Sequence, residues 1–451
     1  MSEQLSVLSY NILYPNTEGW WIYKYYPAHT PRALSAWPAR RALLLRQLKL
    51  ADSDILCLQE TASASFDQDF EALKGEYDHV MHARGMRMRV STFWRKSRLK
   101  LIAEKHKYRT LLTLLRSQDT QRSLLVINVH LSGGPRPKER VEQVAQALSQ
   151  GEKLWRQHRS SEEPMRVIIC GDFNMDLAQS ELESFLRTGA LGPEAREPDY
   201  PETSLTKKGK RHDFGPIVDT VSALRDILET SELTNPTLTV PNLIHRFCQP
   251  LHDQPLSELE RSVLQARETS LEAFSAHLRP DFYEAARVLF ERFADLVAPA
   301  DDQLDESTEQ RDRLRMSHEG ARRWLEEMNG GWRGSESRAW ERLTEQSGQP
   351  SLSFSAWSQI LIAELYAGKW WSVAYDLEMS GASLPPLPQG SPALHCERLD
   401  HILFGGALSP TSWCRGALFD ELEELRRAPR PLPDLDHPSD HIPVGATFEL
   451  S

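Results

Sequence analysis

The chain has 451 residues, which is long enough for two or three domains. Its hydrophobic content of 40% and charged content of 26% are those of an ordinary globular protein. No apolar run reaches the length of a membrane span, and the first residues lack the basic and apolar regions of a secretory signal. The five cysteines lack C-x-x-C spacing, which argues against a zinc module and a disulfide framework. We therefore expect an intracellular protein of the cytoplasm.

Charge is distributed unevenly along the chain. The formal net charge is −11, with +7 in residues 1–212 and −18 in residues 213–451. Residues 213–380 alone carry −13. A basic part is suited to binding a polyanion, and an acidic part would repel one. Two solvated surfaces would give the same distribution, so charge alone identifies no partner.

The first predicted elements are a strand, an aromatic run and a helix. Residues 6–13 alternate in hydrophobicity like a strand, and Asn11 lies near its end. Exposed aromatic side chains in the run that follows would stack on nucleobases, but packing in the interior is the favoured interpretation. Pro38 opens a helix over residues 38–52, with apolar residues at helical spacing. The run contains Trp20, Trp21, Tyr23, Tyr25 and Tyr26.

Three predicted buried strands end in polar residues. Residues 54–60 form an apolar strand that ends in Glu60, an unusual end for a buried strand unless the acid holds a metal. Residues 124–131 carry His130 near their end. The apolar residues 167–170 lead into Asp172 and Asn174, whose side chains can point the same way because extended chain alternates. An ordinary Asx turn would give the same pattern.

The remaining elements surround these strands. The basic stretch 84–100 contains the strand-like VSTFW, and residues 138–155 form an amphipathic helix. Residues 398–404 are a predicted strand that carries Asp400. Asp440 and His441 lie at a turn just before the last predicted strand, VGATFEL.

Together these polar residues predict one cleft at the edge of a sheet sandwich. Carboxylates, carboxamides and imidazoles without cysteine suit a hard cation such as Mg²⁺, or Mn²⁺ in its place. The matching chemistry is hydrolysis at phosphorus, in which a metal neutralises charge and a base activates water. The series is Asn11, Glu60, His130, Asp172, Asn174, Asp400, Asp440 and His441.

The motifs SYNIL, DILCLQE, NVHL, GDFN, LDHIL and PSDHIPV occur in this order. In this the chain resembles the endonuclease/exonuclease/phosphatase superfamily, which has the DNase I-like fold. The resemblance covers about residues 1–212 and 390–451, and the opening block looks closest to the deadenylase and nocturnin branch. It implies an α/β four-layer sandwich of two mixed β-sheets flanked by helices.

The resemblance also implies a role for each site residue. Glu60 would be the principal metal ligand with Asn11 beside it, and Asp440 would be a metal neighbour. Asp172 would orient or deprotonate the attacking water. Asn174 and His130 would bind the phosphate. His441, oriented by Asp400, would stabilise the pentacovalent transition state.

The gap between GDFN and LDHIL exceeds what the family core needs. We predict a catalytic domain in residues 1–212 and 383–451, interrupted by an acidic helical insertion at residues 213–382. Phrases starting at Leu238, Met316 and Leu352 resemble the exit half of EF-hands, but their loops lack the required carboxylates, so tight Ca²⁺ binding is not expected. Asp219 is a rival to Asp400 as the acid that orients His441, and Asp400 is preferred because the neighbours of Asp219 indicate a helix.

These patterns leave three functions open. The favoured one is a Mg²⁺-dependent nuclease of deadenylase type, a 3′-exonuclease acting on RNA. The second is a phosphatase or phosphodiesterase acting on a nucleotide or lipid headgroup. The third is a non-catalytic scaffold whose helical insertion binds a protein partner. The complete polar series favours an enzyme over a scaffold.

Overall fold

The computed structural model describes residues 3–15, 21–83, 87–159, 163–178, 180–198, 200–205, 210–225, 236–296 and 314–451. Outside these ranges lie Trp20, Arg84, residues 206–209 and the first parts of the loops before Leu238 and Met316. The chain divides into two compact units. Unit 1 comprises residues 1–17, 33–240 and 394–451, and unit 2 comprises residues 18–32 and 241–393. Among the described residues, no helix is both long enough and apolar enough to cross a membrane.

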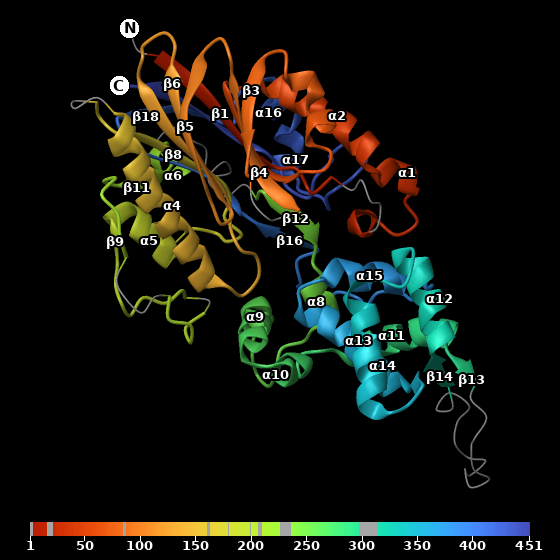
Figure 1. Cartoon of the computed structure of the whole chain (residues 1–451). Helices are drawn as coiled ribbons and strands as arrows, with labels where there is room; N and C mark the ends of the chain where they lie inside the picture. The colour runs from red at the N-terminus through yellow and green to blue at the C-terminus, as the bar shows by residue number, and fades with distance from the viewer. Residues whose placement is uncertain are drawn as a thin grey trace, which may run out of the picture. The chain divides into compact units, whose positions relative to one another are not determined.

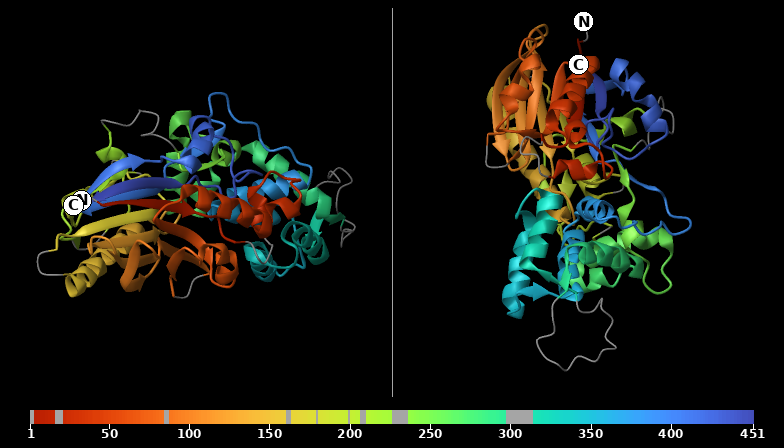
Figure 2. Two further views of the ribbon diagram at one scale, coloured as in Figure 1. Left: turned by 90° about the horizontal axis from the view of Figure 1, so that it is seen from above. Right: turned by 90° about the vertical axis from the view of Figure 1, so that its right-hand side faces the viewer.

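Unit 1 is built on two six-stranded mixed sheets (Figures 1 and 2). The first has the order β18-β19-β1-β2-β4-β3, and the second has the order β11-β17-β8-β7-β6-β5. Parallel pairing joins β1 to β2 and β7 to β8. The strands of the first sheet are β1 (Glu3–Asn11), β2 (Ile55–Ala62), β3 (Tyr77–Met81), β4 (Met88–Arg95), β18 (Leu408–Trp413) and β19 (Val444–Leu450). Those of the second are β5 (Leu99–Lys107), β6 (Thr110–Ser117), β7 (Ser123–His130), β8 (Arg166–Asp172), β11 (Ile217–Asp219) and β17 (Asp400–Gly406).

Helices cover the outer faces of both sheets, so the predicted four-layer sandwich is confirmed. Apolar residues of the two sheets form one core between them, which includes Val7, Cys57, Ile168 and Phe448. The other elements of this unit are α2 (Trp37–Ala51), α3 (Phe66–Asp69), α4 (Pro137–His158), α5 (Glu181–Thr188), α6 (Thr220–Ala223), α16 (Ala417–Glu421), α17 (Glu423–Arg427), β9 (Ala190–Leu191), β10 (Lys210–Arg211), β12 (Leu238–Pro241), β16 (Leu394–Glu397) and a 3₁₀ turn at Glu71–Leu73.

Unit 2 is mainly helical and has its own core, rich in tryptophan and phenylalanine. Trp324 and Trp357 lie fully buried in it, with ring centroids 5.2 Å apart. Its elements are α8 (Leu243–Phe247), α9 (Leu259–Thr269), α10 (Leu271–Ser275), α11 (Pro280–Phe293), α12 (His318–Asn329), α13 (Gly334–Ser347), α14 (Phe354–Tyr366), α15 (Trp370–Met379), β13 (Asp295–Leu296), β14 (Leu314–Ser317), β15 (Ser351–Leu352) and 3₁₀ turns at Ile22–Tyr25 and Leu256–Glu258, while α1 (Arg32–Ser35) begins in this unit and ends in unit 1.

The unit boundaries differ from the predicted domain boundaries in three places: residues 213–240 group with unit 1, and residues 18–32 and 383–393 group with unit 2. Residues 213–240 group with the sheets because β11 pairs with β17, Ile217 with Gly405 and Asp219 with Leu403. The expected helix around Asp219 is therefore a short strand followed by one helical turn. The aromatic run belongs to unit 2, where Tyr23 and Tyr26 are buried. This placement agrees with the packing interpretation of these two residues.

Two of the three phrases that resemble EF-hands pair with each other. Met316 of β14 lies opposite Leu352 of β15, and the hydroxyls of Ser317 and Ser353 accept hydrogen bonds from the first turns of α12 and α14. The third phrase begins in unit 1, where Leu238 bridges to His441. Pairing of this kind orders a loop without supplying charge for a cation.

We predict that unit 2 binds no Ca²⁺ in the micromolar range. The loop of residues 345–356 contains a single carboxylate, Glu345, whereas tight sites need several in twelve residues. Calorimetric titration of the whole chain with Ca²⁺ should give the same isotherm for the wild type and for Glu345→Gln. A micromolar site that Glu345→Gln abolishes would contradict the prediction.

Candidate active site

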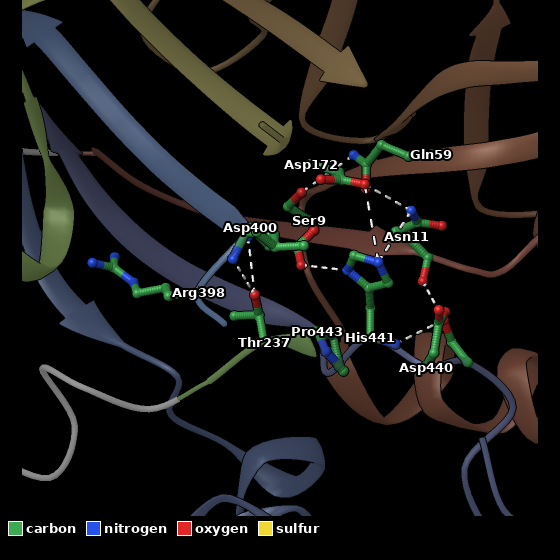
Figure 3. A network of polar contacts seen from close by, with 12 residues as sticks. Ser9, Asn11, Gln59, Asp172, Thr237, Arg398, Asp400, Asp440, His441 and Pro443 are labelled. Carbon is green, nitrogen blue, oxygen red and sulfur yellow. Dashed lines mark hydrogen bonds and ion pairs between the residues drawn. The ribbon is translucent and has the colours of Figure 1, made fainter. Parts of the chain in front are cut away.

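The predicted site residues gather at one edge of the two sheets of unit 1, and Figure 3 shows five of them: Asn11, Asp172, Asp400, Asp440 and His441. Because β1 is parallel to β2 and β7 is parallel to β8, the two strands of each pair end at the same edge. Strand β17 is antiparallel to β8 and begins where β8 ends, with Asp400 opposite Asp172. The loop before β19 completes the edge. The residues brought together are Asn11, Glu60, His130, Asp172, Asn174, Asp400, Asp440 and His441.

Asn11 lies among the carboxylates of the site. Its Nδ2 is 3.0 Å from Asp172 Oδ2 and 3.5 Å from Glu60 Oε1. The same nitrogen lies 3.5 Å from Nε2 of His441. Its Oδ1 accepts a hydrogen bond from the backbone N–H of Leu13 at 3.1 Å. Asn11 therefore connects three of the predicted catalytic groups within a few ångströms.

Asp172 and Asn174 form an Asx turn, and their side chains also contact each other. The backbone N–H of Asn174 donates to Asp172 Oδ1 at 2.7 Å, and its Nδ2 donates to Asp172 Oδ2 at 3.2 Å and to the carbonyl of Leu131 at 3.0 Å. In this arrangement Asn174 fixes the carboxylate. Burial raises the pKa of Asp172 and the Asp400 charge adds to the increase, against the opposing effects of His441 and His130.

His130 faces the same two acids from β7. Its Nε2 is 3.7 Å from Glu60 Oε1 and 3.6 Å from Asp172 Oδ2. Burial lowers the pKa of His130 to about 4, although the charge of Asp172 opposes the change. A neutral imidazole at physiological pH can donate one hydrogen bond to a phosphate oxygen without adding charge.

His441 has the opposite electrostatic setting. Its Nδ1 is 2.7 Å from Asp400 Oδ2, and both side chains are buried. Burial alone would lower the pKa of His441, but the charges of Asp400, Asp440 and Asp172 together raise it well above 6.5. These three charges therefore favour the cationic form of the imidazole, which is suited to stabilising negative charge.

Asp219, the rival orienting acid, lies elsewhere in the same sheet. Its Oδ2 is 2.9 Å from Nδ1 of His401, and Arg398 donates to both of its oxygens. The Nε2 of His401 lies 3.3 Å from the carbonyl of Met175, next to Asn174. Asp219 thus supports the loop after β8 from behind the site.

Asp440 lies between His441 and the end of β1. Burial raises its pKa to about 6, and the charge of Glu60 adds to the increase against the opposing effect of His441. The hydroxyl of the preceding Ser439 donates to the carbonyl of Asn11 at 2.7 Å. That bond fastens the Asp440–His441 turn to the strand that carries Asn11.

The backbone at two site residues is in the left-handed region, where non-glycine residues are strained. Glu60 has φ +65° and Asn174 has φ +53°. The pairing of β2 with β4 shifts register between Leu58 and Thr61, which indicates a bulge at Glu60. The carboxylate also accepts the backbone N–H of Tyr14 at 2.9 Å. These contacts therefore hold the Glu60 carboxylate beside Asn11 and His130.

Arg40 is a supporting residue to which sequence reasoning gave no role, although it lies in the predicted helix over residues 38–52. Its side chain on α2 is buried and donates to the carbonyls of Ile12 at 2.9 Å, Tyr14 at 3.2 Å and Pro438 at 2.8 Å, and also to that of Leu13. One guanidinium therefore joins the turn after β1 to the turn that carries His441.

Thr237 supports the site and was also missed. Its hydroxyl accepts the backbone N–H groups of Leu399 and Asp400, at 2.8 Å and 3.0 Å. It lies in the stretch that sequence analysis assigned to the insertion, and a single threonine in such a stretch carries no signal in the sequence.

The donor set fits a magnesium ion better than a transition metal. Among the described residues, no three His, Cys, Asp or Glu side chains form a compact ligand cluster. Magnesium commonly binds through one or two carboxylates and keeps several waters, so such a cluster is not required. Glu60 and Asp440, with the Asn11 amide beside them, offer oxygen ligands and no sulfur.

We predict that Asp400→Asn lowers kcat for phosphoester hydrolysis by roughly 10- to 100-fold. Without the Asp400 charge, burial would lower the pKa of His441, so the cationic form would be lost at a lower pH. The high-pH limb of the kcat profile should therefore move to lower pH. An unchanged limb in a folded Asp400→Asn variant would show that His441 does not act as the cation.

Comparison with known proteins gives a match over half of the chain. The model of the Endonuclease/Exonuclease/phosphatase family matches residues 8–243. The chain is 36% identical over 103 residues to the CCR4-Not complex 3′-5′-exoribonuclease subunit Ccr4 of Phaeosphaeria nodorum, covering 23% of this chain and 15% of that protein. It is 27% identical over 211 residues to carbon catabolite repressor protein 4 homolog 6 of Arabidopsis thaliana, covering 38% of this chain and 26% of that protein.

These matches therefore span only a minor part of the curated relatives. Among solved structures, the crystal structure of ANGEL2, a 2′,3′-cyclic phosphatase, in complex with adenosine-2′,3′-vanadate is similar with a TM-score of 0.50. The identity is 15%, and the alignment covers 100% of this chain and 96% of that one. At this identity the likeness shows the fold.

Proposed function

Because the chain belongs to the endonuclease/exonuclease/phosphatase family, we propose that it is a divalent-metal-dependent phosphodiesterase that shortens RNA from its 3′ end. The observation that carries the proposal is the convergence of Asn11, Glu60 and Asp172 beside the Asp400–His441 pair. The RNA substrate and the 3′ direction are supported by the similarity to Ccr4, named as a 3′-5′-exoribonuclease subunit.

Glu60, with Asn11 and Asp440 beside it, would hold Mg²⁺ or Mn²⁺, which supplies charge neutralisation at the scissile phosphate. The Tyr14 N–H bond and the bulge at β2 keep the Glu60 carboxylate aimed into the site. Because this geometry is set by the backbone, little reorganisation is required when substrate binds.

We assign to Asp172 the activation of the attacking water. Its raised pKa makes the carboxylate a better proton acceptor than an exposed aspartate. Asn174 fixes this carboxylate through its backbone N–H and its side chain, and its amide is also the group predicted to contact the phosphate. Turning that amide toward substrate would break its bond to Leu131.

The two histidines divide the task of binding the phosphate. His130, neutral at physiological pH, would donate from Nε2 to a phosphate oxygen. His441, cationic and held by Asp400 at Nδ1, would direct its Nε2 at the charge that develops in the pentacovalent transition state. Every group in this scheme belongs to unit 1, so we propose that unit 2 contributes contacts rather than chemistry.

A substrate panel tests this proposal. Labelled oligoadenylate, duplex DNA with an abasic site and a dinucleotide phosphate are each incubated with Mg²⁺ and with excess chelator. We expect stepwise shortening of oligoadenylate from the 3′ end, lost with chelator. Cleavage of only the dinucleotide would identify a small-molecule phosphodiesterase, and no metal-dependent cleavage of any substrate would refute the proposal.

A further inference from the structure

The tip of the β5–β6 hairpin lies beside the active-site edge. Strand β6 is antiparallel to β7, with Thr110 opposite Val129. The next residue of β7, His130, donates its backbone N–H to the carbonyl of Arg109 at 3.0 Å. The two residues of the hairpin turn, Tyr108 and Arg109, therefore lie next to a group that we assign to phosphate binding.

Arg109 lies next to His130. It occupies the turn before β6 with φ +57°, and its carbonyl accepts the backbone N–H of His130. His130 in turn lies opposite Asp172 in the same sheet. Burial lowers the pKa of His130, and the charge of Arg109 adds to that change, as expected of a nearby cation. The guanidinium therefore lies near the imidazole that we assign to phosphate binding.

Arg109 has an unused donor. Among the described residues, its buried Nε atom has no hydrogen-bond partner. The Arg109 guanidinium lies over the ring of Tyr108, with Cζ 5.8 Å from the ring centroid. A buried donor without a partner costs free energy, and a change of rotamer that lets the guanidinium meet a phosphate would recover that cost. The planar guanidinium matches the geometry of phosphate oxygens.

Tyr108 presents an aromatic face to solvent. It is 56% exposed, among the most exposed of the large hydrophobic side chains described. Lys105 is exposed and Lys107 half-buried on the same hairpin, so the surroundings are basic. An exposed ring beside cations is the usual combination for stacking a base while its backbone phosphates are neutralised.

We propose that Tyr108 and Arg109 form a subsite for the nucleotide next to the scissile phosphate of single-stranded RNA. Arg109 binds a phosphate through its guanidinium, and Tyr108 stacks on the base. The subsite rests on the proposed function in that the substrate is a polynucleotide. The subsite would hold a flexible RNA strand in a fixed position, although the site has few other hydrogen-bond donors for its phosphates.

The test is the affinity for fluorescein-labelled decaadenylate RNA, measured by anisotropy in chelator so that no cleavage occurs. We expect Tyr108→Ala to raise Kd about tenfold and Tyr108→Phe to bind like the wild type, because stacking needs only the ring. Arg109→Gln should raise Kd and reduce the slope of log K against log salt by about 0.7, the value for one phosphate on a single strand. Arg109→Lys should retain the slope, since it retains the charge.

Arg46→Gln is the matched control. Arg46 is an exposed arginine on α2 paired with Glu421, and its replacement should leave Kd and slope unchanged. Unchanged Kd and slope in folded Tyr108→Ala and Arg109→Gln would overturn the subsite, as would a wild type that does not bind the RNA. If binding follows the expectation but the wild type cleaves no RNA with Mg²⁺, the subsite stands and the proposed activity fails.

Discussion

Glu60→Gln and Asp172→Asn should each lower kcat for Mg²⁺-dependent hydrolysis by on the order of 10³-fold or more, while the fold persists. Removing a general base costs 10²- to 10⁴-fold, and removing the main ligand of a catalytic metal removes its charge from the transition state as well. Both replacements keep the size of the side chain, and both positions lie at strand ends rather than in the apolar core.

The two variants should differ in metal binding. Manganese titration followed by electron paramagnetic resonance should show weaker binding for Glu60→Gln than for Asp172→Asn, because the former loses the principal ligand. Asp78→Asn, an exposed carboxylate on β3, is the matched control and should leave kcat unchanged. If either site variant kept near wild-type turnover, the assignment of the site would be wrong.

Lys24→Met should destabilise unit 2 by about 3–5 kcal/mol, because it leaves a buried carboxylate without its partner. Lys24 Nζ lies 2.7 Å from Asp376 Oδ1, and both side chains are almost fully buried. The pair fastens the aromatic segment of residues 21–26 to α15. Urea unfolding and hydrogen exchange of the amides of residues 22–26 would measure the loss.

The loss should depend on pH in a defined direction. Burial raises the pKa of Asp376 to about 6, although Lys24 opposes the change, so removing Lys24 raises it further. A carboxyl whose pKa is raised in the folded state binds protons more readily there, and its contribution to stability falls as pH rises from about 4 through that pKa. Lys24→Met should therefore lose less stability at pH 5 than at pH 7.5.

Two controls accompany this prediction. Lys24→Met combined with Asp376→Leu should recover most of the loss, because an apolar pair can replace a buried ion pair. Lys49→Met, at an exposed lysine of α2, should change stability by less than about 0.5 kcal/mol. A single variant as stable as the wild type at pH 7.5 would show that the pair does not hold the segment.

The active-site edge could be predicted because its residues follow strongly apolar strands. The last strand was located at residues 444–450, and the strands leading to Glu60, His130 and Asp172 within a residue or two of their observed bounds. Six motifs in a fixed order then identified the family, and the match over residues 8–243 confirms that resemblance.

The supporting contacts could not be predicted, because they depend on tertiary structure. Arg40 binds backbone carbonyl groups, which every residue carries, so no sequence pattern marks its partners. Thr237 lies in a stretch that groups with unit 1 because β11 pairs with β17. Strand β5 was missed because its pattern of lysine, histidine and glutamate lacks a clear period. The same strand leads to the Tyr108–Arg109 turn.

The most direct test of the proposed chemistry is hydrolysis of oligoadenylate RNA by the wild-type protein in ¹⁸O-labelled water with Mg²⁺, followed by mass spectrometry of the released mononucleotide. If Asp172 activates water for attack at phosphorus, each 5′-AMP released from the 3′ end should carry one ¹⁸O in its phosphate, and Asp172→Asn should release almost none. Absence of labelled 5′-AMP from the folded wild type, or equal release by Asp172→Asn, would contradict the proposed function of this site.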